Sequence, residues 1–170
     1  GSLKRLKRAL RSKKILKLPG IGEKKVKNIE AGIRVHESRS GRLTLGSVVP
    51  TAHETVEELR EATGIDDIEV AGSIRRWRET IGDVDILALS SKPEPVIEAF
   101  TNLPRVAEVL AAGSTKASVR LDDGVQMDLR VVPPKVYGAA LMYFTGSQAH
   151  NVKLRGLAQS KGLKLSEYGV

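Results

Sequence analysis

Ile81-Gly-Asp-Val-Asp-Ile-Leu-Ala-Leu89 is the most informative stretch of this 170-residue chain. Its apolar residues predict a buried β-strand over 83–89. Because side chains alternate between the two faces of a strand, Asp83 and Asp85 are predicted to project to the same side. Val84 and Ile86 then point to the opposite side, into a core. The stretch therefore predicts a sheet that carries a pair of carboxylates on one face.

A second acidic residue pattern lies in Val125-Gln-Met-Asp-Leu-Arg-Val-Val132. The apolar residues of this expected strand occupy one face, which leaves Asp128 on the other. If the two strands are near neighbours, three carboxylates gather in one patch, and their mutual repulsion calls for cations. Carboxylate oxygens suit Mg²⁺ or Mn²⁺. The sequence therefore predicts a divalent-metal site at Asp83, Asp85 and Asp128.

Charge is distributed unevenly along the chain, whose formal net charge is +8. Residues 1–34 hold 12 Lys and Arg against Glu23 and Glu30, whereas the remainder carries a net −2. A basic arm joined to a near-neutral body indicates a polyanionic partner. The absence of cysteine excludes disulfides and thiol chemistry, and no apolar run is long enough to predict a membrane span. A cytoplasmic location is the corresponding expectation.

Periodicity and turn residues predict an α+β fold with a mixed or antiparallel sheet and helices on one face. Thr51-Ala-His-Glu54 is a capping box that predicts a helix start, and Asp122-Asp-Gly124 predicts a hairpin turn between antiparallel strands. Gly32 is expected to end the second helix. The expected helices are 3–16, 23–31, 51–63, 92–100, 134–143 and 147–160, the expected strands are 68–72, 83–89, 106–111, 116–121 and 125–132, and 34–50 is expected to be a loop.

Leu18-Pro-Gly-Ile-Gly-Glu-Lys-Lys-Val-Lys27 is similar to the hairpin of a helix-hairpin-helix motif. Gly20 and Gly22 would let the backbone approach a phosphate closely, and Lys24, Lys25 and Lys27 would add a salt-sensitive attraction. The alternative is an ordinary turn between helices in a solvated basic arm. Binding to a DNA backbone is favoured because the charge and the hairpin coincide.

Gly72-Ser-Ile-Arg-Arg-Trp-Arg78 follows an expected strand and precedes the acidic pair. A Gly-Ser turn offers backbone amides and a hydroxyl to a phosphate, and the guanidinium of Arg76 matches phosphate oxygens in a bidentate manner. By itself the stretch would be a tight turn with surface arginines. Its place upstream of Gly82-Asp-Val-Asp85 favours a phosphate-binding turn at the metal site.

Tyr143-Phe-Thr-Gly-Ser-Gln-Ala-His-Asn151 joins two aromatic residues to a Gly and a Ser that caps the following helix. The default interpretation makes Tyr143 and Phe144 core residues. The functional interpretation makes the stretch a platform for a sugar and a base, with Asn151 offering hydrogen bonds. The three histidines are far apart in the sequence, so a histidine-based site is not expected.

The motifs Gly72-Ser-x-Arg-Arg76, Gly82-Asp-Val-Asp85, Met127-Asp-Leu-Arg130 and Tyr143-Phe-Thr-Gly-Ser147 resemble those of family X DNA polymerases, the DNA polymerase beta-like enzymes. The resemblance runs in matching order from about Leu16 to Val170. Gln126-Met-Asp-Leu-Arg-Val-Val-Pro-Pro134 is more similar to the bacterial and archaeal branch, because the beta-type enzymes have an arginine in place of Gln126.

The resemblance implies a nucleotidyltransferase palm with two Mg²⁺ ions, replaceable by Mn²⁺, and a role for each matching residue. It makes Asp83, Asp85 and Asp128 catalytic metal ligands. Nucleotide binding would involve Gly72, Ser73, Arg76, Gly82, Tyr143, Phe144, Gly146 and Asn151. DNA binding would involve Gly20, Gly22, Lys24, Lys25, Lys27, Arg130 and Arg155. Backbone carbonyls of Leu16, Leu18 and Ile21 would hold a monovalent cation, K⁺ or Na⁺, beside a DNA phosphate.

The same resemblance implies a division of the chain into four segments. Residues 1–34 would be the helix-hairpin-helix that ends the fingers, 35–50 a linker, 51–146 the palm, and 147–170 the start of a truncated thumb. Lyase, nuclease and remaining thumb segments are expected to be missing from this sequence.

The function implied is DNA-directed DNA synthesis of the gap-filling repair type, by a monomer that uses dNTPs and gapped or primed DNA. One alternative is a template-independent nucleotidyltransferase, against which the basic hairpin argues. The other is a non-catalytic DNA-binding fragment of a polymerase. Incorporation directed by a template would separate the first alternative, and salt-dependent binding without incorporation would identify the second.

Overall fold

The computed structural model describes residues 3–12, 14–17, 21–38 and 42–170, which form two compact units divided after Arg42. Two predicted hairpin residues, Leu18 and Gly20, lie outside the described residues, as do the side chains of Leu16 and Lys24. No helix within the described ranges combines the length and the apolar character that a bilayer span requires.

The first unit is helical, as its sequence predicts, but the expected single helix over 3–16 is wrong because the first helix ends at Arg11. It contains α1 (Leu3–Arg11), the 3₁₀ turn η1 (Lys14–Lys17) and α2 (Glu23–Ser38). Leu10, Ile15 and Ile33 are buried together in a small core. The expectation that Gly32 ends the second helix is wrong, because α2 continues to Ser38. A glycine inside a helix costs only about 1 kcal/mol, and burial of the next residue, Ile33, offsets that cost.

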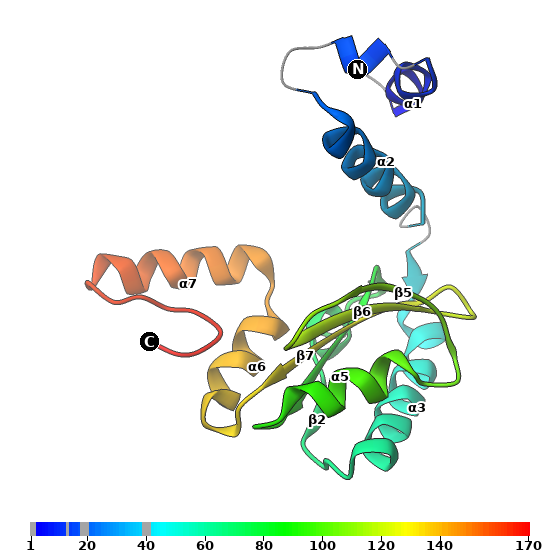
Figure 1. Ribbon diagram of the computed structural model, residues 1–170. Helices are drawn as coiled ribbons and strands as arrows, with labels where there is room; N and C mark the ends of the chain where they lie inside the picture. The colour runs from blue at the N-terminus through cyan, green and yellow to red at the C-terminus, as the bar shows by residue number, and fades with distance from the viewer. Residues whose placement is uncertain (1–2, 13, 18–20, 39–41) are drawn as a thin grey trace. The chain divides into compact units, whose positions relative to one another are not determined.

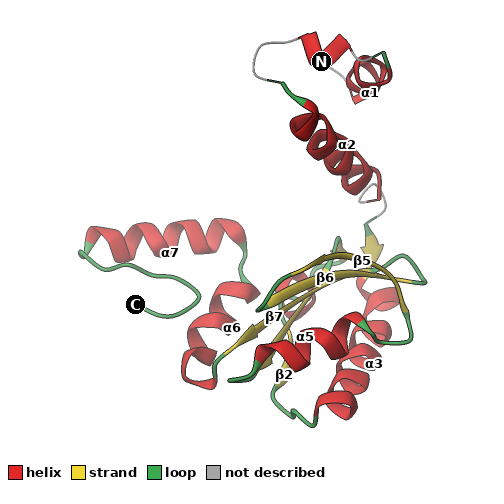
Figure 2. Cartoon of the chain, viewed as in Figure 1, coloured by secondary structure: helices red, strands yellow, loops and turns green. Residues whose placement is uncertain are grey.

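The second unit is built on a five-stranded mixed sheet (Figures 1 and 2). Its strand order is β2-β4-β7-β6-β5, and only the β4–β7 pair is parallel. The strands are β2 (Ile68–Val70), β4 (Val84–Leu89), β5 (Val106–Ala112), β6 (Lys116–Leu121) and β7 (Gln126–Val132). The predicted strands are thereby confirmed to within two residues at each end. A separate two-stranded ribbon pairs β1 (Leu43–Thr44) with β3 (Thr80–Ile81).

The turn between β6 and β7 has the predicted hairpin form. The N–H of Leu121 donates to the carbonyl of Val125 at 2.9 Å, and Gly124 has φ 85°. A positive φ is a conformation that glycine adopts without strain. The two strands are antiparallel neighbours, as expected.

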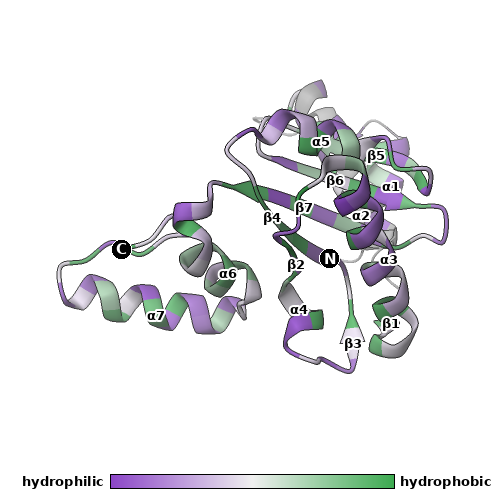
Figure 3. Ribbon diagram, turned by 90° about the horizontal axis from the view of Figure 1, so that it is seen from below, coloured by the Kyte–Doolittle hydropathy of each residue, from purple (hydrophilic) through white to green (hydrophobic). Residues whose placement is uncertain are grey.

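The main core lies on one face of the sheet, under α3 (Leu45–Thr63) and α5 (Pro93–Thr101). Phe100 and Leu59 are completely buried there against alternate residues of β4 and β7. On the other face, Leu87 and Val132 pack against Ala140 of α6 (Tyr137–Thr145). The short turns α4 (Gly72–Arg75) and η2 (Pro134–Val136) precede β3 and α6, and α7 (Gln148–Ser160) follows α6. In Figure 3, hydrophilic and hydrophobic bands alternate along α7.

Helix α3 begins six residues before the predicted capping box, so that prediction is wrong. The expected loop at 34–50 is wrong too, because 34–38 lie in α2, 43–44 in β1 and 45–50 in α3. The N-cap of α3 is Thr44, and Pro50 lies inside the helix. Thr51, the expected cap, is buried, and its hydroxyl lies 3.3 Å from a carboxylate oxygen of Asp123. The earlier start is explained by Val48, which is fully buried and joins the main core. That apolar burial offsets the hydrogen bond that Pro50 cannot donate.

Gly32→Ala should stabilise the first unit, because Gly32 is an exposed helical residue with no atom near the position of an added Cβ. The expected gain is about 0.5–1 kcal/mol, measured by thermal unfolding followed by circular dichroism. Gly64→Ala is the matched control: Gly64 ends α3 with φ 68°, so this variant should be destabilised. A lower unfolding midpoint for Gly32→Ala would show that Gly32 acts as a helix terminator after all.

Candidate functional site

Asp85 and Asp128 lie side by side on adjacent strands. They are partners in the parallel register of β4 and β7. Neighbouring strands are about 4.8 Å apart, and partners in register project to the same face. Both residues are partly exposed on the face opposite the main core. The structure therefore brings these two predicted site residues together.

Asp83 lies directly before β4, and its charge acts on Asp85. The pKa of Asp85 is raised to about 7, first by burial and then by the charges of Asp83 and Asp128, while Arg76 opposes the rise. Because solvent and salt screen charges that are far apart at a protein surface, the charges that shift the pKa of Asp85 act on it at short range. The three acidic residues thus form one electrostatic cluster.

Gln126 orients the carboxylate of Asp128. Its side-chain amide nitrogen lies 3.1 Å from one carboxylate oxygen and 3.3 Å from the other. A neutral amide holds the carboxylate in place without neutralising its charge. The sequence had singled out this position only as a departure from the beta-type enzymes.

The acidic cluster fits a divalent cation in its donor chemistry. Its ligands are all oxygens, and a cation would relieve the repulsion that raises the pKa of Asp85. As the side chains are placed, no three acidic or histidine residues in the described part of the chain converge closely enough to hold a metal ion. The residues therefore fit Mg²⁺ in type and in strand register, without a closed set of ligands.

Gly72 packs directly against Asp85. It has φ 56°, and a Cβ built there would lie 1.8 Å from a carboxylate oxygen of Asp85. Only glycine permits both this backbone conformation and this approach. The Gly72-Ser73 turn, predicted to bind phosphate, therefore touches the acidic cluster, and the partly exposed Ser73 follows within α4.

Arg76 connects the turn to the junction between α6 and α7. Its guanidinium donates a hydrogen bond to the backbone carbonyl of Thr145, a residue that sequence reasoning had not singled out. The same guanidinium lies beside Gly146, where an added Cβ would stand 3.2 Å from it. Its charge also opposes the rise in the pKa of Asp85. Arg76 therefore holds the turn, the acidic cluster and the 145–147 segment together.

The aromatic pair lies at the end of α6. The Tyr143 and Phe144 rings meet edge to face at 5.4 Å, and the guanidinium of Arg130 lies 5.3 Å from the centre of the Phe144 ring. Asn151 donates from its side chain to the carbonyl of Tyr143 at 2.7 Å, while its own side-chain oxygen is buried without a partner. An unpartnered buried acceptor is costly unless a ligand or water donates to it. Asn151 is thus poised to accept one more hydrogen bond.

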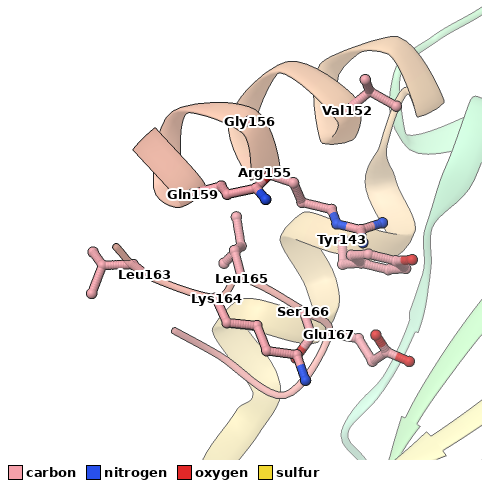
Figure 4. Close-up of a pocket in the computed structure, with 10 residues that line it drawn as sticks. All are labelled: Tyr143, Val152, Arg155, Gly156, Gln159, Leu163, Lys164, Leu165, Ser166 and Glu167. Atoms are coloured by element: carbon pink, nitrogen blue, oxygen red, sulfur yellow. The ribbon is translucent and has the colours of Figure 1, made fainter. Parts of the chain in front are cut away.

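A cavity of about 630 Å³ lies between α7 and the C-terminal segment (Figure 4). Tyr143 and Arg155, two predicted site residues, line it, and the Arg155 side chain extends from α7 toward the Tyr143 ring. Residues 163–167 form the opposite wall, which sequence reasoning missed because no periodic pattern marks them. The three aspartates do not line this cavity.

The described residues of the predicted hairpin belong to the first unit. Gly22, Lys25 and Lys27 are exposed, and the carbonyl of Gly22 accepts from the N–H of Val26 at 3.1 Å in the first turn of α2. Ile21 is partly buried against the small core of that unit. Gly82, in the second unit, is exposed next to Asp83.

Comparison with known proteins identifies relatives along nearly the whole chain. The chain is 35% identical over 167 residues to a Bacillus subtilis protein named DNA polymerase/3'-5' exonuclease PolX, and the match covers 97% of this chain and 29% of that protein. It is 29% identical over 117 residues to rat DNA polymerase lambda, covering 58% of this chain and 20% of that protein. A family model described as DNA polymerase beta thumb matches residues 140–170.

Solved structures share the fold. A ternary primer–template complex of Leishmania infantum polymerase beta superposes with a TM-score of 0.71 at 23% identity, covering 96% of this chain and 67% of that one. The ternary gap complex of the same enzyme also gives 0.71. The expected α+β polymerase-like fold and the resemblance to family X are thereby confirmed. The chain spans less than a third of the length of the two curated relatives.

Asp85→Asn should change the pH dependence of stability in metal-free buffer. Because the folded pKa of Asp85 is about 7 and an unfolded aspartate has a pKa of about 3.9, the folded protein binds an extra proton between these values. This group therefore lowers the free energy of unfolding as pH rises from about 4 to about 7. The free energy of unfolding of the variant should not show that decline, and it should exceed that of the parent most above pH 7.

Urea unfolding in EDTA across this pH range measures the effect, with Asp122→Asn in the β6–β7 turn as the control. A difference between Asp85→Asn and parent that stays constant with pH would refute the raised pKa.

Proposed function

This chain is related in sequence and fold to the family X DNA polymerases, and from that relationship we propose that it carries out nucleotidyl transfer in gap-filling DNA synthesis. A deoxynucleotide would be transferred from a dNTP to the 3′-hydroxyl of a primer, with release of pyrophosphate. The observation that carries the proposal is the parallel register of Asp85 and Asp128 beside the Gly72 turn.

Asp83 and Asp85 would hold both divalent ions, and Asp128 would hold the ion nearest the primer end. Bound Mg²⁺ or Mn²⁺ would supply charge neutralisation and activation of the 3′-hydroxyl. Gln126 keeps the Asp128 carboxylate in a fixed orientation, which supports its role as a metal ligand. Asp128 would also accept the hydroxyl proton. The protein contributes mainly positioning and electrostatics, as expected for this class of reaction.

The triphosphate would bind at the turn formed by Gly72, Ser73 and Arg76, with Gly82 alongside. Arg76 has one guanidinium nitrogen committed to the carbonyl of Thr145, and this contact fixes its direction toward the acidic cluster. Tyr143, Phe144 and Gly146 would contact the sugar. The unpartnered oxygen of Asn151 supports its assignment to the incoming nucleotide.

DNA would be held by the helix-hairpin-helix unit through Gly20, Gly22, Lys24, Lys25 and Lys27, and by Arg130 and Arg155. The exposure of Lys25 and Lys27 supports backbone contacts by that unit. A K⁺ or Na⁺ ion at the carbonyls of Leu16, Leu18 and Ile21 belongs to the same proposal. The proposed segments are the fingers end at 1–34, the palm at 51–146 and the thumb from 147, in a cytoplasmic monomer. The 35–50 segment between the first two contains the end of α2 and the start of α3.

Asp128→Ala should abolish nucleotide addition while leaving DNA affinity nearly unchanged. Loss of several kcal/mol of transition-state stabilisation corresponds to a decrease of about a thousandfold. Primer extension on gapped DNA, with Mg²⁺ or Mn²⁺ and each dNTP singly, measures the rate and whether the template selects the nucleotide. Equal rates in variant and parent would reject the assignment.

Gly72→Ala should also stop nucleotide addition, because its Cβ would displace the Asp85 carboxylate. Gly124→Ala is the matched control, since Gly124 also has positive φ but has no atom within 4 Å of an added Cβ. Both variants should lose some stability through backbone strain, of about 1 kcal/mol or more. Only Gly72→Ala should lose activity, and retained activity there would place Asp85 outside the reaction.

A further inference from the structure

A second cavity, of about 490 Å³, lies beside the C-terminal part of α4 and Trp77. It is lined by residues of α3, the edge strand β2 and α4 and by Trp77, and none of the three aspartates lines it. Its apolar walls come from Val49, Val56, Ile68, Val70, Ile74 and Trp77. The proposed polymerase reaction gives this cavity no role.

The open edge of β2 has one unused pair of backbone hydrogen-bonding groups. The N–H of Leu89 donates to the carbonyl of Asp67, and the N–H of Ala71 donates to the carbonyl of Asp85. Backbone groups alternate in direction along an antiparallel strand, so the N–H and carbonyl groups of Ile68 and Val70 point away from β4. The outward N–H of Ile68 donates to the backbone carbonyl of Asp66, and the carbonyl of Ile68 accepts from the guanidinium of Arg60. Among the described residues, the outward N–H and carbonyl of Val70 have no hydrogen-bond partner.

Trp77 stands at the mouth of this cavity in a strained conformation. It is 77% exposed and has φ 52°, the one positive φ of a non-glycine residue among those described. A bulky residue held at positive φ costs about 1–3 kcal/mol, which is most readily understood where the side chain serves a function. Exposed tryptophans beside apolar pockets are frequent anchors of binding.

The two arginines that line the cavity are already paired. Arg60 forms an ion pair with Glu57 at 2.6 Å, and Arg75 forms one with Glu69 at 3.3 Å. These pairs leave no unpaired arginine in the cavity lining for the phosphates of a nucleic acid. A donor and an acceptor on one strand residue beside an apolar pocket instead match a peptide backbone and one apolar side chain.

We propose that the β2 edge and this cavity form a docking site for an extended, uncharged peptide segment of a partner protein. The segment pairs with Val70 as an added strand and places an apolar side chain against Trp77. The other edge strand, β5, is a poorer template because its register shifts twice along its pairing with β6.

The test uses the whole chain and blocked pentapeptides of the form acetyl-TVXVT-amide, with Val, Leu, Phe or Trp at the centre. Trp77 is the only tryptophan of the sequence, so for the Val, Leu and Phe peptides a shift of its fluorescence to shorter wavelength reports binding directly. Hydrogen exchange at the Val70 amide should slow in the complex. Alternate N–H groups of an added strand point toward β2 and away from it. N-methylation of the set that points toward β2 should weaken binding about tenfold or more, and N-methylation of the other set should not.

Trp77→Ala should weaken peptide binding about tenfold, followed by NMR, without lowering the unfolding midpoint. Val109→Ala, an exposed apolar residue of β5, should bind like the parent. Asp128→Ala should also bind normally, which separates this site from the proposed catalysis. The proposal is overturned if no peptide binds at up to about 1 mM, or if both methylated sets bind equally. The proposal is also overturned if oligo-dT displaces the peptide and causes the same shift of Trp77 fluorescence, because the site would then bind nucleic acid.

Discussion

The enforced proximity of Asp85 and Asp128 is the constraint on which the rest of the structure depends. Two carboxylates in register on adjacent strands repel one another, and burial of Asp85 strengthens the effect. The strands cannot slip apart, because a shift by one residue would turn the buried Val84 and Met127 out of the core. The apolar face of the sheet therefore holds the polar face in an arrangement that attracts cations.

The elements that the sequence predicted best are those set by local signals. Alternation along 83–89 and 125–132 and the turn at Asp122–Gly124 depend on neighbouring residues, and the structure agrees with each. The start of α3 and the passage of α2 through Gly32 depend on burial of Val48 and Ile33 against distant residues. Such tertiary contacts override local helix signals and are not visible in a single sequence.

The candidate site divides in the same way. The residue types and their spacing predicted the three aspartates, but the parallel neighbourhood of β4 and β7 is a long-range pairing that alternation alone does not specify. The hydrogen bond from Arg76 to Thr145 joins residues 69 positions apart and involves a backbone carbonyl, which carries no sequence signal. The close approach of Gly72 to Asp85 is likewise visible only in three dimensions, although the glycine itself is a local hint.

The two edges of the sheet are protected in different ways, and the difference bears on what the molecule can bind. Irregular register along β5 disrupts the regular row of groups that a second strand would need. Strand β2 is only three residues long, and the carbonyl of Ile68 accepts a hydrogen bond from Arg60. Among its described residues, only Val70 therefore has outward backbone groups available for pairing. A single open residue cannot nucleate indiscriminate sheet growth, but beside an apolar cavity and Trp77 it suffices to fix the register of one short segment. Selective docking and resistance to aggregation are therefore compatible at this edge.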